Sequence, residues 1–433
     1  MSRRITKVAV LGSGVMGSGI ACHFANIGLE VLMLDIVPRD LPEDQQKDPA
    51  TRNSIVNAAL KSAIKSKPAA LYHKDFASRI TTGNFEDDFA KIKDCDWVIE
   101  VVVERLDIKK KVFDQVEQHR KPGSLITSNT SGIPIHMMLE GRSDDFKKHF
   151  CGTHFFNPPR YMRLLEIIPT PETDPEVVDF FMHYGDVYLG KQTVLCKDTP
   201  AFIANRVGVY AMAKIYQLTT ELGLRIEEVD KLTGPTIGRP KTGTFRLGDL
   251  VGHDTAANVI NGLKQNCPDD EQAATFEIPK YLQFLLDNKF LGNKTGQGFY
   301  KRTKEKDENG RRVILALNLE TLEYEPSQKP DLPSLKMAKQ IDDQDKRIAA
   351  MFDADDKGGE LVRKSLLGLF AYVSNRIPEI SDNLYSIDDA MKAGYAWNVG
   401  PFEYWDIIGI EKGIQLAEEQ GEKIALWVKD MVA

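Results

Sequence analysis

The chain has 433 residues, of which 42% are hydrophobic and 27% are charged, and its formal net charge is -7. This composition is typical of a soluble globular protein with two or three packed domains, and it excludes a disordered chain. The negative charge argues against nucleic acid as the main partner, although a local basic patch could still bind a phosphorylated ligand. No apolar run reaches the roughly 18 residues that a membrane span needs.

Both ends of the chain and its cysteines indicate a cytoplasmic protein. The first residues, MSRRITKVAVLG, enter a strand almost at once and leave no room for a signal or transit peptide. The last residues, MVA, are not a peroxisomal signal. The five cysteines are widely spaced and form no CxxC pair, which is typical of reduced thiols and predicts no metal site.

The first part of the chain alternates predicted strands and helices. Residues 48–78 are predicted to form a long amphipathic helical arm, and 106–119 a charged helix. Strands are predicted at 7–11, 30–35, 97–103, 124–128, 152–156 and 162–168. This rhythm predicts a doubly wound, mostly parallel sheet over residues 1–195.

After about residue 196, helical spacing replaces the strands. We expect a first helical domain over 196–300 and a second helical unit over 346–433, joined by a charged linker over 301–345. The Asp-Glu-Asn-Gly turn at 307–310 makes a hairpin in that linker plausible. The predicted fold class is therefore α/β, with an all-α C-terminal domain.

A weak internal repeat relates the two helical units. Residues 244–252 match residues 401–409, because Phe, Asp and Gly recur at the same spacing. Both copies lie in helical regions and follow a glycine-rich loop. We therefore interpret the C-terminal domain as two related helical units.

The glycine-rich sequence GSGVMG follows a strand and opens a helix within a βαβ unit. In such a motif the glycines permit a tight turn, close approach to a pyrophosphate, and packing of helix on strand. The acidic residue that ends the second strand would bind ribose hydroxyls and repel a 2′-phosphate. The motif predicts a Rossmann domain that binds NAD, with an empty glycine-rich turn as the alternative. The expected cofactor contacts are Gly12, Gly14, Val15, Met16, Gly17 and Asp35.

His154 ends another predicted strand, at the sheet edge where such folds bind ligands. Histidine is suited to take a proton from an alcohol near neutral pH. Glu166 interrupts an apolar strand, where a carboxylate needs a partner. We expect the two to pair as a catalytic base and its orienting acid, against the alternative of a core histidine. His149, which follows two lysines, is expected to lie at an exposed start of the strand.

Two further groups have weaker signals. Ser131, in SNTSG after a strand, could bind a substrate oxygen or a nicotinamide, but ordinary loop capping explains it equally well. Lys61, Lys65 and Lys67 could bind ligand phosphates, but a solvated helix face is at least as good an explanation.

Six segments together resemble the 3-hydroxyacyl-CoA dehydrogenase family of β-oxidation. They span about the first 300 residues in the order of that family. The segments are VAVLGSGVMGSGIA at 8–21, VIEVVVERLDIKKKVF at 98–113, SNTSGIPI at 128–135, HFFNPP at 154–159, DTPAFIANR at 198–206 and KTGQGFYK at 294–301.

The resemblance implies a set of site residues. It places the catalytic pair on His154 and Glu166 and makes Ser131 a substrate contact. It also implies active-site asparagines at Asn157 and Asn205, nicotinamide- and ribose-side contacts at Glu104, Lys109 and Lys294, and CoA as the phosphorylated ligand of Lys61, Lys65 and Lys67.

The implied activity is NAD-dependent oxidation of a (3S)-3-hydroxyacyl-CoA to a 3-oxoacyl-CoA, with His154 as general base. The alternatives are a dehydrogenase of free 3-hydroxy acids and a non-enzymatic NAD-binding structural or sensor protein. A homodimer is expected from the family. The tandem helical units are similar to those of multifunctional members, which implies an enoyl-CoA hydratase as a separate partner or a missing fused domain.

Overall fold

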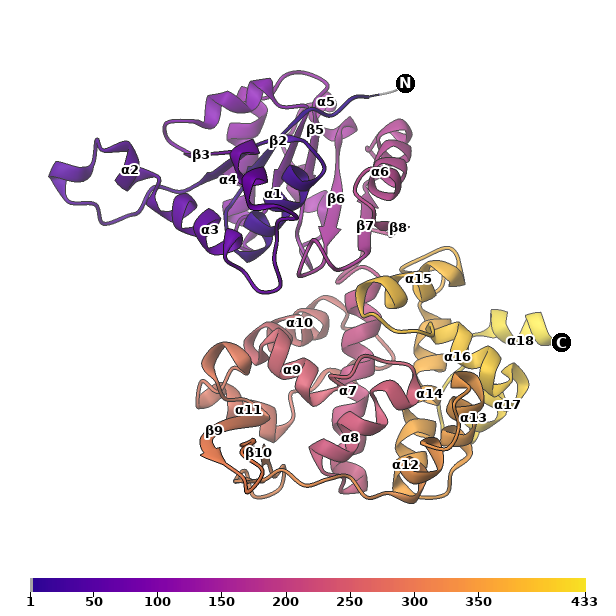
Figure 1. Ribbon diagram of the computed structural model, residues 1–433. Helices are drawn as coiled ribbons and strands as arrows, with labels where there is room; N and C mark the ends of the chain where they lie inside the picture. The colour runs from indigo at the N-terminus through magenta and orange to yellow at the C-terminus, as the bar shows by residue number, and fades with distance from the viewer. Residues whose placement is uncertain (1–2) are drawn as a thin grey trace. The chain divides into compact units, whose positions relative to one another are not determined.

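The computed structural model describes residues 3–433, which divide into two compact units at Phe202 and Ile203 (Figure 1). The first unit contains an eight-stranded sheet with helices packed on it, and the second is mainly helical. The predicted α/β fold followed by a helical C-terminal region is therefore confirmed. No helix within residues 3–433 is long and apolar enough to cross a membrane.

The sheet of the first unit has the strand order β3-β2-β1-β4-β5-β6-β7-β8. Strands β1 to β6 are parallel, β7 is antiparallel to β6, and β8 is parallel to β7. The order reverses at β1, and open α/β sheets bind their ligands at such a point. The bounds are β1 (Lys7–Leu11), β2 (Glu30–Asp35), β3 (Ile80–Asn84), β4 (Trp97–Glu100), β5 (Leu125–Ser128), β6 (Phe150–Phe155), β7 (Leu164–Pro169) and β8 (Gln192–Leu195).

Aromatic side chains fill the core between this sheet and its helices. Trp97 of β4 lies with its ring centroid 4.9 Å from that of Phe24 and 5.0 Å from that of Phe181. Its indole N–H donates to the hydroxyl of Thr127 at 2.9 Å, so its one polar atom is satisfied. The main helices of the unit are α1 (Val15–Asn26), α4 (Leu106–His119), α5 (Asp144–Lys148) and α6 (Pro175–Val187).

The prediction of a single arm helix over 48–78 is wrong. The structure has two helices, α2 (Pro49–Arg52) and α3 (Ser54–Ile64), followed by a coil and the 3-10 helix η2 (Lys74–Arg79). Pro68 explains why no helix continues, because proline lacks an N–H group and disfavours helical geometry at the residue before it. Lys61 therefore lies on α3, whereas Lys65 and Lys67 follow the helix.

The second unit is built from helices and one small sheet. Strands β9 (Tyr300–Lys306), β10 (Arg312–Leu317) and β11 (Tyr324–Pro326) pair antiparallel, and Asp307–Gly310 forms the turn between the first two. The helices are α7 (Ala204–Leu222), α8 (Ile226–Leu232), α9 (Phe245–Val251), α10 (His253–Asn266), α11 (Lys280–Asp287), α12 (Pro333–Ala338), α13 (Gln344–Asp353), α14 (Lys357–Asn375), α15 (Leu384–Gly394), α16 (Pro401–Ile408), α17 (Ile410–Glu419) and α18 (Leu426–Val432). The 3-10 helices of this unit are η5 (Pro235–Ile237), η6 (Ala273–Phe276) and η7 (Asn293–Thr295). Those of the first unit, besides η2, are η1 (Glu43–Gln45), η3 (Phe89–Asp94) and η4 (Ile135–Met138).

The sequence repeat corresponds to two helix pairs with matching hydrogen bonds. Asp230 of α8 accepts from two backbone N–H groups at the start of α9, at 2.6 and 3.2 Å. Asp388 of α15 does the same at the start of α16, at 2.8 and 3.2 Å. The long helices that precede these pairs, α7 and α14, pack together, with Tyr210 and Tyr372 stacked at 3.8 Å between ring centroids.

Candidate active site

The glycine-rich loop after β1 leaves space for a ligand on one side only. Gly12 has a φ of 105°, and a Cβ on it would lie 2.6 Å from the carbonyl oxygen of Val101. A Cβ on Gly17 would lie 1.9 Å from the carbonyl oxygen of Gly12, so both positions require glycine. A Cβ on Gly14 would meet nothing within 4 Å, which leaves the loop open where a pyrophosphate would approach.

The start of α1 has polar groups that fit a phosphorylated ligand. No side chain caps the helix at Gly14, so the backbone N–H groups of its first turn are available to an anion. Val15, the first residue of the helix, is 75% exposed, and Met16 is half-buried. Asp35 ends β2, where its carboxylate accepts from the backbone N–H of Ser13 at 2.7 Å and from its hydroxyl at 2.5 Å. These features fit the expected NAD site, and Ser13 holds Asp35 beside the loop.

The structure brings His154 and Glu166 into direct contact. They are paired residues of β6 and β7, and Nδ1 of His154 lies 2.7 Å from a carboxylate oxygen of Glu166. His154 is 4% exposed and Glu166 is 0% exposed, so the pair is shielded from water. Nε2 of His154 lies 3.1 Å from the hydroxyl oxygen of Ser131. Because a carboxylate only accepts, the hydrogen of the neutral imidazole lies on Nδ1 and Nε2 keeps its lone pair.

Aromatic rings flank this histidine. The ring centroids of Phe156 and Phe202 lie 4.5 and 5.7 Å from that of His154. Asn129 accepts from the backbone N–H of Phe155 at 2.8 Å, which ties the loop after β5 to the end of β6. Asn157, two residues beyond the end of β6, is exposed, and its role toward a substrate stays a prediction.

Glu104 holds the loop that carries Ser131. One carboxylate oxygen of Glu104 accepts from the hydroxyl of Thr130 at 2.5 Å and from the backbone N–H groups of Ser131 and Gly132 at 3.0 and 3.1 Å. Burial favours a higher pKa for Glu104, but Lys109 and these donors outweigh it and hold the pKa below its ordinary value. Glu104 therefore stays ionised and fixes Ser131 beside His154.

Lys109 lies in a buried ion-pair network. It is 1% exposed, and its ammonium lies 2.8 Å from a carboxylate oxygen of Glu100 and 3.2 Å from one of Glu104. Glu100 also accepts from the hydroxyl of Ser128 at 2.6 Å, and burial raises its pKa against the opposing effect of Lys109. A direct contact between Lys109 and the cofactor stays a prediction, because the contacts of Lys109 in this structure are with carboxylates.

The sequence analysis missed Glu100 and Ser13. Glu100 has the same signal that identified Glu166, a carboxylate within an apolar strand, here in WVIEVVV. Ser13 has no comparable signal, because small residues are common between the first two glycines of such loops.

Two predicted site residues, Asn205 and Lys294, belong to the second unit. Asn205 is the second residue of α7, and its side-chain oxygen accepts from the hydroxyl of Tyr395 at 3.3 Å. Lys294 lies in η7 and forms an ion pair with Asp254 of α10. Their roles toward a ligand stay predictions.

The three lysines of the arm are exposed. Lys61, Lys65 and Lys67 form no ion pair with any residue between 3 and 433, so their charges are available to a phosphorylated ligand. Which of them bind one stays a prediction.

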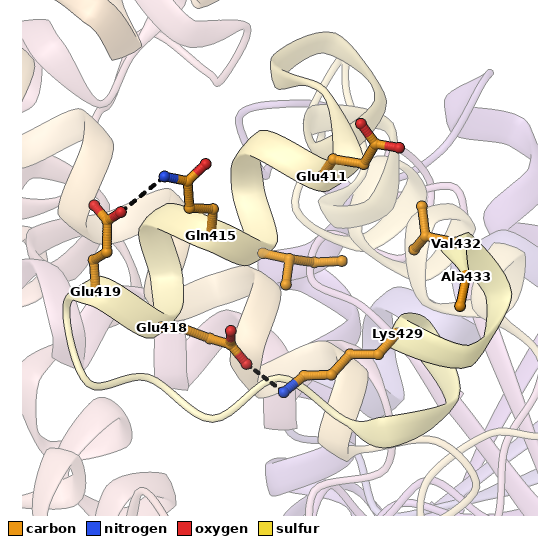
Figure 2. Close-up of a pocket in the computed structure, with 8 residues that line it drawn as sticks. Glu411, Gln415, Glu418, Glu419, Lys429, Val432 and Ala433 are labelled. Atoms are coloured by element: carbon orange, nitrogen blue, oxygen red, sulfur yellow. Dashed lines mark hydrogen bonds and ion pairs between the residues drawn. The ribbon is translucent and has the colours of Figure 1, made fainter.

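A groove between α17 and α18 contains none of the predicted site residues. Its volume is about 620 Å³, and Figure 2 shows Glu411, Glu418 and Glu419 around it, with Glu418 paired to Lys429. The excess of carboxylates would repel a phosphorylated ligand. This groove therefore does not fit NAD or CoA.

Comparison with known families decides the classification. Residues 7–199 match the family described as "3-hydroxyacyl-CoA dehydrogenase, NAD binding domain", and residues 202–302 match its "C-terminal domain". The chain belongs to the 3-hydroxyacyl-CoA dehydrogenase family. The first unit is thus the NAD-binding domain of that family, which confirms the predicted cofactor.

Two relatives are similar to this family member over all or nearly all of its length. A "Probable 3-hydroxyacyl-CoA dehydrogenase" of Bacillus subtilis is 45% identical over 100% of the chain and 54% of the relative. A "Putative fatty acid oxidation complex trifunctional enzyme" of Rickettsia felis is 36% identical over 93% of the chain and 53% of the relative. The chain therefore spans about half the length of these two relatives.

A solved structure extends the likeness in fold to the second helical unit. The 3-hydroxybutyryl-CoA dehydrogenase from Escherichia coli aligns with a TM-score of 0.69 and 22% identity. The alignment covers 99% of this chain and 98% of that protein. At this identity the likeness shows the fold alone, and it includes residues beyond the two family matches.

Proposed function

We propose that this protein oxidises the hydroxyl group of a (3S)-3-hydroxyacyl-CoA to a ketone, with NAD⁺ as oxidant, in the β-oxidation of fatty acids. The observation that carries the proposal is the buried His154–Glu166 pair, in which Nε2 of His154 keeps its lone pair and faces Ser131. A base oriented in this way at the edge of an NAD-binding sheet is suited to remove a proton from an alcohol.

In this reaction Nε2 of His154 accepts the hydroxyl proton as the C–O bond gains double-bond character. Glu166 keeps the imidazole in the required tautomer and stabilises the imidazolium that forms. Ser131, held by Glu104, hydrogen-bonds the reacting oxygen, and Asn157 binds the thioester carbonyl. The proton then passes from His154 to water, which restores the base for the next turnover.

The glycine-rich loop, the first turn of α1 and Asp35 would hold the cofactor in the first unit. Held there, NAD⁺ would supply the hydride acceptor for C3, so that the products would be a 3-oxoacyl-CoA, NADH and one proton. The negative charge of Asp35 opposes a 2′-phosphate and favours NAD over NADP.

The CoA part of the proposal rests on the relatives, whose names specify acyl-CoA chemistry, and on the exposed lysines of the arm. The test measures NADH formation from (3S)-3-hydroxybutyryl-CoA and from free 3-hydroxybutyrate at equal concentrations. We expect a much higher kcat/KM for the CoA ester. A higher kcat/KM for the free acid would show that the substrates are free 3-hydroxy acids. No activity with either compound would favour a non-enzymatic role.

The partners follow from the same relatives. The name of the trifunctional relative from Rickettsia felis supports further activities fused to or acting with this chain, and an enoyl-CoA hydratase as one of them stays a prediction. A homodimer and a cytoplasmic location stay predictions. Size measurement of the purified chain by light scattering tests the first of these.

A further inference from the structure

The turn between β6 and β7 connects the strand of His154 to the strand of Glu166 and carries Asn157. Two cationic side chains outside the predicted site, Lys191 and Arg160, hold this turn. Lys191 fixes it to the sheet, and Arg160 fixes it to the arm.

Lys191 lies just before β8 and is 4% exposed. Its ammonium donates to the backbone carbonyls of Pro159 and Met162, the latter at 2.7 Å. It forms no ion pair within residues 3–433, and burial lowers its pKa to about 8. A buried ammonium without a counter-ion needs such carbonyls as compensation, so the turn cannot move freely away from Lys191.

Arg160 lies on the turn itself and reaches residues 69–72, the part of the arm that follows α3. One of its terminal nitrogens donates to the carbonyls of Ala69 and Leu71 at 2.7 and 2.8 Å. Its guanidinium lies 4.4 Å from the ring centroid of Tyr72, and the hydroxyl of the neighbouring Tyr161 donates to Ala69 at 2.9 Å. Four contacts therefore join the turn to this short segment.

The same segment is also fixed to α1. Asn26 of that helix donates to the carbonyl of Ala70 at 2.9 Å and accepts from the backbone N–H of Tyr72 at 2.8 Å. Residues 69–72 are thus held from two sides, although they lie in coil. The hydroxyl of Ser66, which lies between Lys65 and Lys67, donates to the carbonyl of Pro68 at 3.0 Å and accepts from the backbone N–H of Ala70 at 3.2 Å, so hydrogen bonds link these two lysines to the segment.

We propose that Arg160 is a positioning residue that sets the distance between the phosphate-binding lysines of the arm and His154. This inference rests on the proposed function, in which the phosphates of CoA and the reacting hydroxyl are two ends of one substrate. Binding of a remote, non-reacting part of a substrate aids the reaction only when the enzyme holds both subsites at a fixed separation. Arg160 maintains that separation because it joins the turn after the strand of His154 to residues 69–72 of the arm.

The test compares two substrates, 3-hydroxybutyryl-CoA and the N-acetylcysteamine thioester of the same acid, which has no nucleotide. Arg160→Met is expected to lower kcat/KM for the CoA ester by roughly 10- to 100-fold, since a misplacement of about 1 Å can cost 10²-fold. The truncated thioester does not use the arm, so its kcat/KM should change little. Arg160→Lys, which keeps a donor and a charge, should recover part of the loss on the CoA ester.

Arg163→Met is the matched control. Arg163 leads from the same turn into β7 and is exposed, and within residues 3–433 its guanidinium donates only to the side chain of Gln192, at 3.3 Å. Its substitution should leave kcat/KM for both substrates unchanged. Lys191→Met, which disturbs the turn itself, should lower kcat/KM for both substrates by similar factors.

A readout without substrate accompanies the kinetics. Amide hydrogen exchange at residues 69–72 should accelerate in Arg160→Met and stay as in the wild type in Arg163→Met.

If Arg160→Met does not fold, Tyr161→Phe removes one contact to Ala69 and should give a smaller loss of kcat/KM, confined to the CoA ester. Equal losses on both substrates, or no loss on either, would overturn the inference. A wild-type protein without activity on 3-hydroxybutyryl-CoA would instead overturn the proposed function.

Discussion

The imidazole of His154 is fixed at both ring nitrogens. Glu166 accepts from Nδ1 at 2.7 Å, and the hydroxyl of Ser131 lies 3.1 Å from Nε2. One buried carboxylate therefore determines which nitrogen is basic. At the scale of single residues, the proposed reaction depends on this tautomer more than on any other feature of the site.

Replacing Glu166 by glutamine tests that dependence. The amide can donate to Nδ1, which moves the ring hydrogen to Nε2 and removes the base. We expect Glu166→Gln to lower kcat toward the limit of roughly 10²- to 10⁴-fold that a positioned base contributes. Steady-state NADH formation measures the effect. Glu176→Gln, in the exposed first turn of α6, should leave kcat unchanged, and an equally unchanged kcat in Glu166→Gln would contradict the role.

We expect Asp35 to determine the choice between NAD and NADP. Its carboxylate is held by Ser13 beside the glycine-rich loop, where its charge opposes a 2′-phosphate. We expect Asp35→Asn to reduce the ratio of kcat/KM with NAD to kcat/KM with NADP. Asp40→Asn, on the exposed loop after β2, is the control and should keep the wild-type ratio. A ratio unaffected by Asp35→Asn would exclude this residue as the determinant.

At the scale of elements, a buried ion pair joins β4 to α4. Lys109 of the helix contacts Glu100 of the strand and Glu104 of the loop between them. The loop that carries Ser131 is in turn bound to Glu104. The stability of this βα unit and the position of Ser131 therefore depend on the same ammonium group.

Removal of Lys109 should leave two carboxylates facing each other without a counter-ion. Breaking a buried pair in this way costs about 3–5 kcal/mol, so Lys109→Met should lower the free energy of unfolding by that order. The adjacent Lys110 pairs with Glu140 at the surface, and Lys110→Met should change the free energy of unfolding by at most ~1 kcal/mol. Urea denaturation measures both, and equal effects of the two substitutions would contradict the account.

The repeated helix pairs of the second unit each contain a buried aspartate with a raised pKa. Burial raises the pKa of Asp230 to about 7, against the effect of hydrogen bonds from Tyr300 and the start of α9. Burial likewise raises the pKa of Asp388 to about 7. The two corresponding positions thus share a raised pKa and two backbone hydrogen bonds, whereas the hydroxyl of Tyr300 donates to Asp230 alone and the charge of Glu403 adds to the shift at Asp388.

These aspartates give the stability of the second unit a specific pH dependence. Between the unfolded value of 3.8 and about 7, the folded state binds more protons at Asp230 than the unfolded state does. The contribution of Asp230 is therefore fully present below 3.8, and the free energy of unfolding falls as pH rises through this window. Asp230→Asn should remove that part of the slope, measured by urea denaturation from acid to neutral pH. Asp269→Asn, at an exposed position, should keep it, and an unchanged slope in Asp230→Asn would contradict the assignment.

At the scale of the whole molecule, hydrophobic patterning predicted six of the eight strands in the sheet of the first unit and missed β3 and β8. The predicted strands at 7–11 and 30–35 coincide with β1 and β2, because buried parallel strands appear as continuous apolar runs. The arm was predicted less well, since apolar periodicity continues past Ile64 although Pro68 prevents a continuous helix. The turn residues at 307–310 predicted the hairpin of β9 and β10, whereas local pattern does not contain the pairing of β10 with β11 that completes this sheet.

A site residue could be predicted from sequence where its residue type is unusual among its neighbours in the chain. Glu166 is unexpected in an apolar strand, and the pairing of β6 with β7 then gives it His154 as a partner. Lys191 and Arg160 are ordinary surface residue types, and only the folded chain shows that they hold the catalytic turn. The role of a charged residue can be predicted from sequence when its neighbours in the chain are apolar. Otherwise its role becomes visible only in the folded structure, through contacts with residues far away in the sequence.

The proposed reaction requires His154 as the base of an NAD-dependent oxidation of a 3-hydroxyacyl-CoA. The most direct test measures NADH formation from (3S)-3-hydroxybutyryl-CoA by the wild type, His154→Gln and His149→Gln. His149 follows α5 as its C-cap residue, where its Nδ1 contacts the carbonyl of Asp145 at 2.7 Å, and its substitution should leave kcat unchanged. His154→Gln should lower kcat by roughly 10²- to 10⁴-fold while calorimetry shows that NAD still binds. A kcat of His154→Gln equal to that of the wild type would contradict the account.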